Sequence, residues 1–441
     1  MCPVEQDLDG SRFVRALMRF DLVQGHPHPP GYPLLVLLGR VAMRAVGAPS
    51  LALSLVSAVA FAVTASSAFT VTWRATRSRP TAYLAALTFA LGTCATVQST
   101  RPLSDMLGCA LAWSTLRLAE SPSRNGFHGA LIGMLAAARP SALPITLVGA
   151  LRRSRGNLRS ALTLAGTGAL TALILYAPAV WSVGLTRFAS LVTEHAEGHF
   201  TRFGGSVVTR PDLVERARAF AFGVHAHLLG GWWTDRAPWL LPATVATWAL
   251  VLAGAARARA VTLLRGPLAS CAVYVAWVFF GQNVVWQPRH LLPLAPAVAI
   301  LAALGFDALR ARARWVAVAL AVLALAPAAV ESSRLLRTQS RVRPPTLRIV
   351  DEIERRCDPA RTLVATGQLA TWIRFRASGH RVVEVRDIDE ALSLARRNGV
   401  GLCVTSEVAG VEARGLRRVA RVEGDRYVTS TLYDLALWMT P

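Results

Sequence analysis

Lysine is absent from this chain, so all 48 of its lysine-plus-arginine residues are arginines. Charge is also scarce: 17% of the residues are charged, whereas about 25% are charged in a typical soluble domain. This scarcity argues against a soluble protein. The formal net charge of +22 suggests a nucleic-acid partner, but arginine without lysine fits a GC-rich genome better than phosphate binding. We therefore expect no nucleic acid.

Cysteine is rare, and the six residues of the chain are scattered, with no spacing typical of a metal site. The sequence therefore predicts no metal site, and a requirement for an unknown divalent metal stays open. Cys357 and Cys403 lie in the polar C-terminal tail, where they either pair, if that tail is outside the cytoplasm, or remain free thiols. Residues 1–30 also lack the apolar core of a cleavable signal peptide.

Long apolar stretches are what the chain has in abundance. It is 53% hydrophobic, with a mean hydropathy of +0.40. A helix needs about 20 apolar residues to cross a bilayer, and four windows without charge meet that length: 49–73, 160–186, 237–256 and 266–288. The sequence therefore predicts a polytopic integral membrane protein embedded in a lipid bilayer.

Short arginine-rich loops between the apolar windows predict the topology, since such loops face the cytoplasm. Two crossings between consecutive basic loops give a mainly α fold, a polytopic transmembrane helical bundle of about ten membrane segments. Two central segments, split at Arg139–Pro140, are too short for independent crossings. They form either two half-length helices or one broken helix, and the flanking arginine loops favour two helices. The expected segments are 49–73, 81–98, 103–119, 127–138, 140–151, 159–182, 237–256, 260–281, 289–306 and 315–331.

This topology places residues 1–48 outside the cytoplasm as a first loop with interfacial helices. Arg40 and Arg44 lie one turn apart on one face of residues 33–48. That pattern is typical of an interfacial amphipathic helix, although a tilted first half of the next span is the alternative. An outer N-terminal segment needs a preceding span to carry it across the membrane. We therefore expect a first transmembrane helix encoded upstream of Met1.

The remaining two domains follow from composition. Residues 49–333 form the transmembrane domain, which includes a large outer loop at 183–236. From residue 334 to residue 441 the chain is polar and alternates helical with β-rich segments. Such alternation predicts a small extramembrane α/β domain.

The outer N-terminal segment carries carboxylates ahead of a rigid, proline-rich run. Partial desolvation near a membrane raises the basicity of a carboxylate, which can then accept a proton from an attacking hydroxyl. Asp7 and Asp9 are the candidates, and a solvated acidic terminus or a helix N-cap is the alternative interpretation. In Gly-His-Pro-His-Pro-Pro-Gly-Tyr-Pro (25–33), four prolines fix the backbone and His28 and Tyr32 project from it. A metal site at His26 and His28 is a weaker interpretation, because no third ligand lies nearby in the sequence.

Four motifs on the non-cytoplasmic side of the predicted membrane topology carry a family resemblance. They are His-Pro-Pro-Gly-Tyr-Pro (28–33) behind the acidic segment, Ser-Thr-Arg-Pro-Leu-Ser-Asp (99–105), Ala-Arg-Pro-Ser (138–141) and Gln-Pro-Arg-His-Leu-Leu-Pro (287–293). In this order, over residues 5–331, the chain resembles the GT-C-type membrane glycosyltransferases. The resemblance is closest to the branch of protein O-mannosyltransferases and lipid A aminoarabinose transferases.

The resemblance implies transfer of a sugar, here a hexose, from a polyprenyl-phosphate donor to a hydroxyl, with inversion. Asp9 matches the first-loop aspartate, the general base, and Asp7 is the fallback. The chain departs from the family pattern in two ways. Gly10 replaces the second acidic residue, and the first span is missing from this sequence.

Arginines at outer turns are the candidates for binding the donor phosphate, because the guanidinium fork matches phosphate oxygens. We expect Arg289 to be the first candidate for this role, followed by Arg139 and Arg101. The alternative for each arginine is that its side chain only extends from a helix end to the membrane interface. Charged, imidazole and phenol side chains on the same side of the membrane are candidates for binding the substrates. They are His28, Tyr32, Asp105, His195, His199 and His290.

The sequence thus favours an integral membrane glycosyltransferase of the bacterial inner membrane with its active site facing outward. The acceptor hydroxyl, on a glycan, lipid or protein, stays open. A transporter or flippase is the first alternative, but it needs polar groups at the bilayer midplane and often internal repeats, which we do not find. A non-catalytic membrane scaffold is the second alternative.

Overall fold

The computed structural model describes residues 8–118, 125–155, 157–201, 205–377, 379–429 and 432–440. The chain forms two compact units. The helical unit runs from Arg12 to Leu336, and the C-terminal unit begins at Arg337 and also includes Leu8–Ser11. Each unit is described here by itself.

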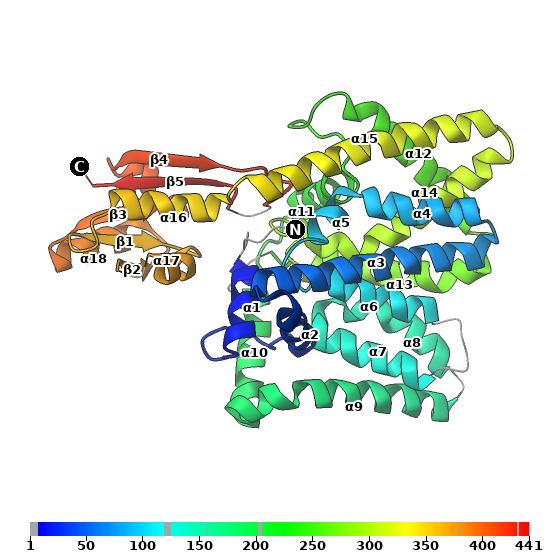
Figure 1. The fold of residues 1–441 in the computed structure, drawn as a ribbon, viewed down its shortest axis with the longest axis horizontal. Coiled ribbons are helices and arrows are strands. Elements are labelled where there is room, and N and C mark those ends of the chain that lie inside the picture. Colours follow the sequence, from blue (N-terminus) through cyan, green and yellow to red (C-terminus); the bar gives the residue numbers. More distant parts are fainter. Residues whose placement is uncertain are drawn as a thin grey trace. The chain divides into compact units, whose positions relative to one another are not determined.

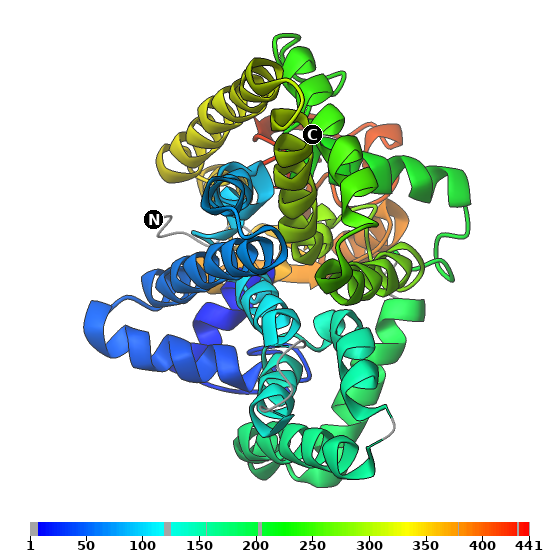
Figure 2. The same ribbon diagram turned by 90° about the vertical axis from the view of Figure 1, so that its right-hand side faces the viewer.

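The helical unit is a bundle whose long helices run roughly parallel to one another, and Figure 2 looks nearly along them. Its membrane part is mainly α-helical, as expected. In chain order its elements are α1 (Leu8–Met18), α2 (Pro33–Val46), α3 (Pro49–Thr76), α4 (Arg79–Leu91), α5 (Thr93–Gln98), α6 (Asp105–Leu118), α7 (Asn125–Ala138), η1 (Pro140–Thr146), α8 (Leu147–Ser154), α9 (Leu158–Val183), α10 (Leu185–Thr201), α11 (Leu213–Phe222), η2 (Gly223–Leu228), α12 (Leu240–Ala258), α13 (Thr262–Gly281), η3 (Pro288–Leu294), α14 (Ala295–Arg310) and α15 (Arg314–Arg341).

Helices occupy every position where a membrane segment is expected. Within the described part of the chain, six helical segments are long and apolar enough to cross a membrane. The total number of crossings stays a prediction, because α4, α6, α7 and α8 are shorter. The six segments are Pro49–Thr76, Leu158–Val183, Leu240–Ala258, Thr262–Gly281, Pro288–Arg310 and Arg314–Arg356.

Two breaks inside expected segments shape the bundle. Residues 81–98, expected as one span, are two helices because Gly92 takes an extended conformation between α4 and α5. The expected break at Arg139–Pro140 is confirmed: Arg139 is extended, and Pro140 opens η1, which leads into α8. Proline fits the first position of a helix, because its missing N–H needs no partner there.

Glycine lets two pairs of helices approach at the level of their backbones. A Cβ added to Gly133 of α7 would lie 2.3 Å from the Gly168 carbonyl oxygen of α9. A Cβ on Gly254 of α12 would lie 1.7 Å from the Leu301 oxygen, and one on Gly305 of α14 would lie 1.8 Å from the Leu250 oxygen. Small residues at such crossings are typical of helix packing in membranes.

The outer elements include a helix where one is expected and further helices in the expected outer loop. Helix α2 (Pro33–Val46) lies in the segment 33–48, and the Arg40 side chain donates to the Ala16 and Leu17 carbonyls at the end of α1. The expected outer loop 183–236 contains α10, α11 and η2.

The C-terminal unit is the expected small α/β domain. Its five-stranded sheet has the order β2-β1-β3-β5-β4; β1 pairs in parallel with β2 and β3, and β5 pairs antiparallel with β3 and β4. Cys357 and Cys403 form a disulfide, which resolves the two alternatives for these residues. The elements (Figure 1) are α16 (Pro345–Arg356), β1 (Thr362–Thr366), α17 (Ala370–Arg376), β2 (Arg381–Glu384), α18 (Ile388–Asn398), β3 (Gly401–Thr405), η4 (Val411–Ala413), β4 (Arg417–Glu423) and β5 (Asp434–Met439).

Candidate functional site

Three helix ends of the helical unit converge on one buried ion cluster, which we call the arginine cluster: Asp105, Arg139 and Arg289. Arg139 Nη2 lies 2.8 Å from Asp105 Oδ1. Arg289 Nε lies 3.8 Å from the same oxygen. The side chains are 9%, 4% and 3% exposed for Arg139, Arg289 and Asp105. All three were expected at the site, and the structure brings them together.

Two guanidinium groups of the cluster share one carboxylate. A buried charge is costly unless it is paired and hydrogen-bonded. Arg139 is held further by Ser104, whose Oγ accepts a hydrogen bond of 3.0 Å from Nη1. The cluster therefore holds two guanidinium groups in fixed positions around a shared carboxylate.

Arg101 lies on the turn that precedes Asp105 and is 2% exposed. Helix α3 holds this turn with hydroxyl groups: Ser57 Oγ donates to the Arg101 carbonyl at 2.7 Å, and Ser54 Oγ donates to the Thr100 carbonyl at 2.8 Å. The charges of Arg101, Asp105 and Arg289 act on the buried thiol of Cys94 in α5. Arg101 therefore belongs to the same region of the fold.

A glycine on α6 makes room for the arginine cluster. A Cβ on Gly108 would lie 2.6 Å from Cδ and 2.8 Å from Cβ of Arg139. The Arg139 side chain therefore runs directly over Gly108, one turn after Asp105. Gly108 is not among the expected site residues, because a glycine inside a helix does not indicate which side chain crosses it.

Aromatic side chains fix the turn that carries Arg289. Trp113 Nε1 donates to the Pro293 carbonyl at 2.8 Å, and Tyr274 Oη donates to the His290 carbonyl at 2.9 Å. Both aromatic rings are buried. His290 thus follows Arg289 on a turn that α6 and α13 hold rigidly, and its side chain is half-buried. Sequence reasoning missed Trp113 and Tyr274 because they resemble ordinary core residues.

Three expected imidazoles and one expected phenol of the outer segments gather in a second group, which we call the histidine cluster: His28, Tyr32, His195 and His199. His28 Nε2 lies 3.0 Å from Tyr32 Oη. The ring centroids of His28 and His195 are 5.1 Å apart, and those of His195 and His199 are 4.9 Å apart. Residues from the first loop and from α10 therefore form one surface.

The first loop leads into α2 at Tyr32. Tyr32 has a left-handed backbone conformation, with φ of 45°, and caps α2 directly before Pro33. Its ring packs edge-on against Phe13 of α1, with centroids 5.0 Å apart. Asp9 lies in the first turn of α1, one helical turn before Phe13, and Asp7 lies outside the described residues. Asp9 as the general base stays a prediction.

Close to the histidine cluster, His26 contacts a cation. Arg15 Nη1 lies 3.3 Å from His26 Nε2. Partial burial, together with the charge of Arg15, lowers the pKa of His26 from its ordinary value. Among the described residues, no group of three or more histidine, cysteine, aspartate or glutamate side chains is arranged to hold a metal ion.

These observations define a polytopic α-helical membrane protein with a buried site at its helix ends that contains two arginines and an aspartate. Its fold is similar to that of ArnT from Cupriavidus metallidurans. The apo structure of ArnT matches with a TM-score of 0.53 and 15% identity, over 99% of this chain and 94% of ArnT. The structure of ArnT bound to undecaprenyl phosphate matches with a TM-score of 0.52 and 16% identity, over 98% and 92%.

ArnT is a lipid A aminoarabinose transferase with the GT-C fold. The resemblance inferred from the sequence motifs is thereby confirmed at the level of the fold. No protein-family model and no curated protein matches the sequence.

Proposed function

We propose that this protein is a membrane glycosyltransferase that moves a sugar from a polyprenyl-phosphate donor to an acceptor hydroxyl. The arginine cluster is the observation that carries the proposal. It combines two buried guanidinium groups with one carboxylate at the ends of membrane helices. A phosphate is the anion that best matches such a pair, since arginine offers it a planar fork of donors.

The chemistry needs stabilisation of a leaving phosphate. The bond between the sugar C1 atom and the donor phosphate oxygen breaks, and the acceptor oxygen forms the new bond to C1 from the opposite face. The electron pair of the broken bond stays on the phosphate, where Arg289 and Arg139 stabilise the developing charge. The acceptor proton passes to a carboxylate base, for which we propose Asp9 and, failing that, Asp7.

Asp105 has a positioning role in this scheme. It holds both guanidinium groups in place before the donor arrives, through contacts of 2.8 Å and 3.8 Å. A preorganised pair of donors needs little rearrangement when charge develops on the phosphate. Ser104 supports the same orientation through its hydrogen bond to Arg139.

We place the reaction on the outer side of a bacterial inner membrane. The Cys357–Cys403 disulfide supports this orientation for the C-terminal unit, because disulfides persist in oxidising compartments. The arginine cluster lies at one end each of α6, α7 and η3. In the predicted topology these helix ends adjoin the outer turns. The histidine cluster is the proposed contact surface for the sugar or the acceptor, and a hexose is the first donor sugar to test.

The test uses membranes that contain the whole protein and radiolabelled polyprenyl-phosphate sugars. Release of the label from the lipid is followed in the wild type, in Arg289→Gln and in Asp9→Asn. We expect each variant to lose at least about a hundredfold in rate, the scale for removing one group that stabilises the transition state. Arg210→Gln, at a half-exposed arginine that pairs with Glu215, is the matched control.

The possible outcomes separate the parts of the proposal. Turnover that survives Asp9→Asn but not Arg289→Gln moves the base to Asp7 or elsewhere and keeps the donor site. Turnover unaffected by Arg289→Gln contradicts the donor site itself. If the wild type turns over none of several donor sugars, the glycosyltransferase proposal is wrong.

A further inference from the structure

Two glutamines lie on the turns that carry arginines of the proposed donor site. Gln98 ends α5, three residues before Arg101. Gln287 directly precedes η3, two residues before Arg289. Gln98 is buried, with 2% of its surface exposed, and Gln287 is half-buried. Each glutamine therefore has a backbone position that is fixed together with an arginine.

The side-chain oxygens of both glutamines are buried and accept no hydrogen bond. Within the described part of the chain, no donor reaches Gln98 Oε1 or Gln287 Oε1. Most buried polar atoms of a folded protein have a partner, and a buried acceptor without one lowers stability. Two such oxygens beside one site are better explained by a ligand that donates hydrogen bonds than by packing.

Helix α5 presents Gln98 on the face that lies toward the arginine cluster. Cys94 precedes Gln98 by four residues, so both side chains lie on one face of the helix. The charges of Asp105 and Arg289 act on the buried thiol of Cys94, and α5 contacts η3, which carries Arg289. The Gln98 amide is therefore next to the proposed phosphate site.

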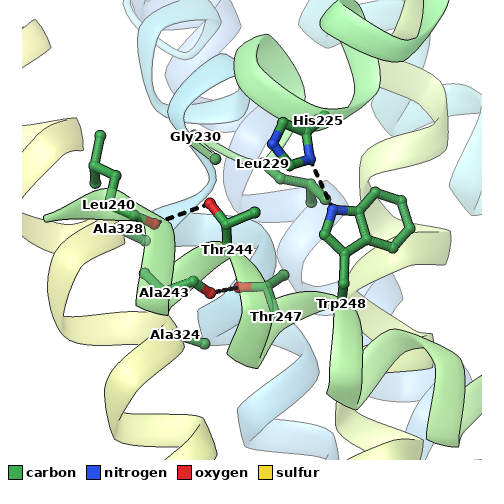
Figure 3. A pocket seen from close by; sticks show the side chains of 11 residues that line it. His225, Leu229, Gly230, Leu240, Ala243, Thr244, Thr247, Trp248, Ala324 and Ala328 are labelled. Atoms are coloured by element: carbon green, nitrogen blue, oxygen red, sulfur yellow. Dashed lines mark hydrogen bonds between the residues drawn. The ribbon is translucent and has the colours of Figure 1, made fainter. Parts of the chain in front are cut away.

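Contacts with η2 hold the start of α5 in place. Thr93 Oγ1 donates to the His227 carbonyl at 2.8 Å. Helix η2 is fixed in turn by α12, where Trp248 Nε1 donates to His225 Nδ1 at 2.8 Å (Figure 3). The cavity beside His225 has a volume of about 10 Å³, room for one water molecule at most. This side of α5 therefore offers no space for a sugar, and the side that carries Gln98 remains.

The amide oxygens and the arginines match different groups of a ligand. A guanidinium group only donates hydrogen bonds, so it suits the oxygens of a phosphate, whereas an amide oxygen only accepts them. The phosphodiester that joins a sugar to a lipid has no hydrogen to donate, but the hydroxyl groups of the sugar beside it do. A site that combines both kinds of protein group therefore matches a sugar bonded to a phosphate.

We propose that Gln98 and Gln287 bind hydroxyl groups of the donor sugar and so help to select it. This inference rests on the proposed function, because the arginine cluster is assigned to the phosphate of the same donor. A site built to bind a hydroxyl group rejects an analogue that lacks it, since the buried acceptor is then left unpaired. The donor sugar is therefore one that keeps its hydroxyl groups, such as a hexose.

The experiment compares the binding of two lipids to the whole purified protein. One is undecaprenyl phosphate, and the other is undecaprenyl phosphate-linked glucose or mannose, whichever binds the wild type more tightly. Gln98→Leu and Gln287→Leu remove the amide and keep a side chain of similar size. We expect each variant to bind the sugar lipid about tenfold more weakly and to bind undecaprenyl phosphate like the wild type.

Thermal unfolding separates sugar recognition from a structural role. Gln98→Leu removes a buried acceptor that has no partner among the described residues, so its Tm should equal or exceed that of the wild type. Gln339→Leu is the matched control, because Gln339 is also buried, with 3% exposed, but belongs to the C-terminal unit. It should bind both lipids like the wild type. If Gln98→Leu does not fold, the unbranched and adaptable side chain of Gln98→Met replaces it.

Other outcomes overturn the inference. A wild type that binds both lipids equally does not recognise the sugar. If Gln98→Leu binds the sugar lipid as tightly as the wild type, or loses affinity for both lipids equally, Gln98 does not bind the sugar. In these cases, undecaprenyl phosphate binding that is impaired in Arg289→Gln keeps the donor site. If that binding does not depend on Arg289, the proposed function and this inference fail together.

Discussion

Arg139 and Asp105 form a 2.8 Å ion pair between the turn that follows α7 and the first turn of α6. Neither side chain has more than a tenth of its surface exposed. The pair joins two segments that are not adjacent in the chain, and Arg289 from a third segment contacts the same carboxylate. Its contribution to stability and its contribution to ligand binding can be separated by experiment.

Asp105→Asn should destabilise the fold and weaken phosphate binding. Removing one partner of a buried ion pair leaves an uncompensated charge and costs about 3–5 kcal/mol of unfolding free energy. The two guanidinium groups lose the carboxylate that holds them in place, so undecaprenyl phosphate should bind more weakly and stabilise the variant less than the wild type. Thermal unfolding with and without undecaprenyl phosphate measures both effects.

Asp307→Asn is the control for that experiment, because Asp307 pairs with Arg310 in a partly exposed position. Exposed pairs contribute about 0–1 kcal/mol, so its Tm should barely change. A folded Asp105→Asn variant with wild-type stability would contradict the structural role of the pair. A variant that binds the lipid as tightly as the wild type would contradict the positioning role of Asp105.

Gly108→Ala should impair the donor site without changing any charge. The new methyl group would lie 2.6 Å from Arg139 Cδ, so Arg139 must move away from Asp105. We expect a loss of about 1–3 kcal/mol of stability from overpacking and about a tenfold weaker binding of undecaprenyl phosphate. Gly166→Ala on α9 is the control, since a Cβ there meets nothing within 4 Å. Equal binding by the two variants would contradict the close passage of Arg139.

The positions of the helices follow from the sequence because burial in lipid imposes a simple requirement. Each crossing needs about 20 apolar residues, and arginine loops mark the cytoplasmic ends. Pro140 predicts the break after Arg139, because proline cannot continue a helix. The arginine–proline turns also predicted three arginines for the donor site, and two of the three contact Asp105.

The contacts within the site could not be predicted from the sequence. No local sequence pattern shows that Asp105 pairs with Arg139 and Arg289, because this pairing depends on how three distant helix ends pack together. The break at Gly92 was also missed, since an isolated glycine in an apolar segment is compatible with a continuous helix.

Removing the disulfide should weaken the C-terminal unit. Cys357 and Cys403 are 46 residues apart, and closing such a loop contributes about 4 kcal/mol in the chain-entropy model, within the usual 2–4 kcal/mol. Cys357→Ala with Cys403→Ala should lower the free energy of unfolding of this unit by that amount. Dithiothreitol should lower the Tm of the wild type and leave the double variant unchanged. An equal response of both proteins would contradict the disulfide.

The first outer loop should loosen in mild acid. Burial and Arg15 lower the pKa of His26, so the unfolded loop binds a proton more readily than the folded loop. The stability that neutral His26 provides is therefore fully present above its ordinary pKa of 6.5 and is lost as the pH falls through its lower folded value. Hydrogen exchange of the backbone amides at residues 21–26 should be faster at pH 5 than the intrinsic pH dependence predicts. His26→Gln should remove this additional increase in the exchange rate. If the increase is unchanged in this variant, the pH response belongs to another group.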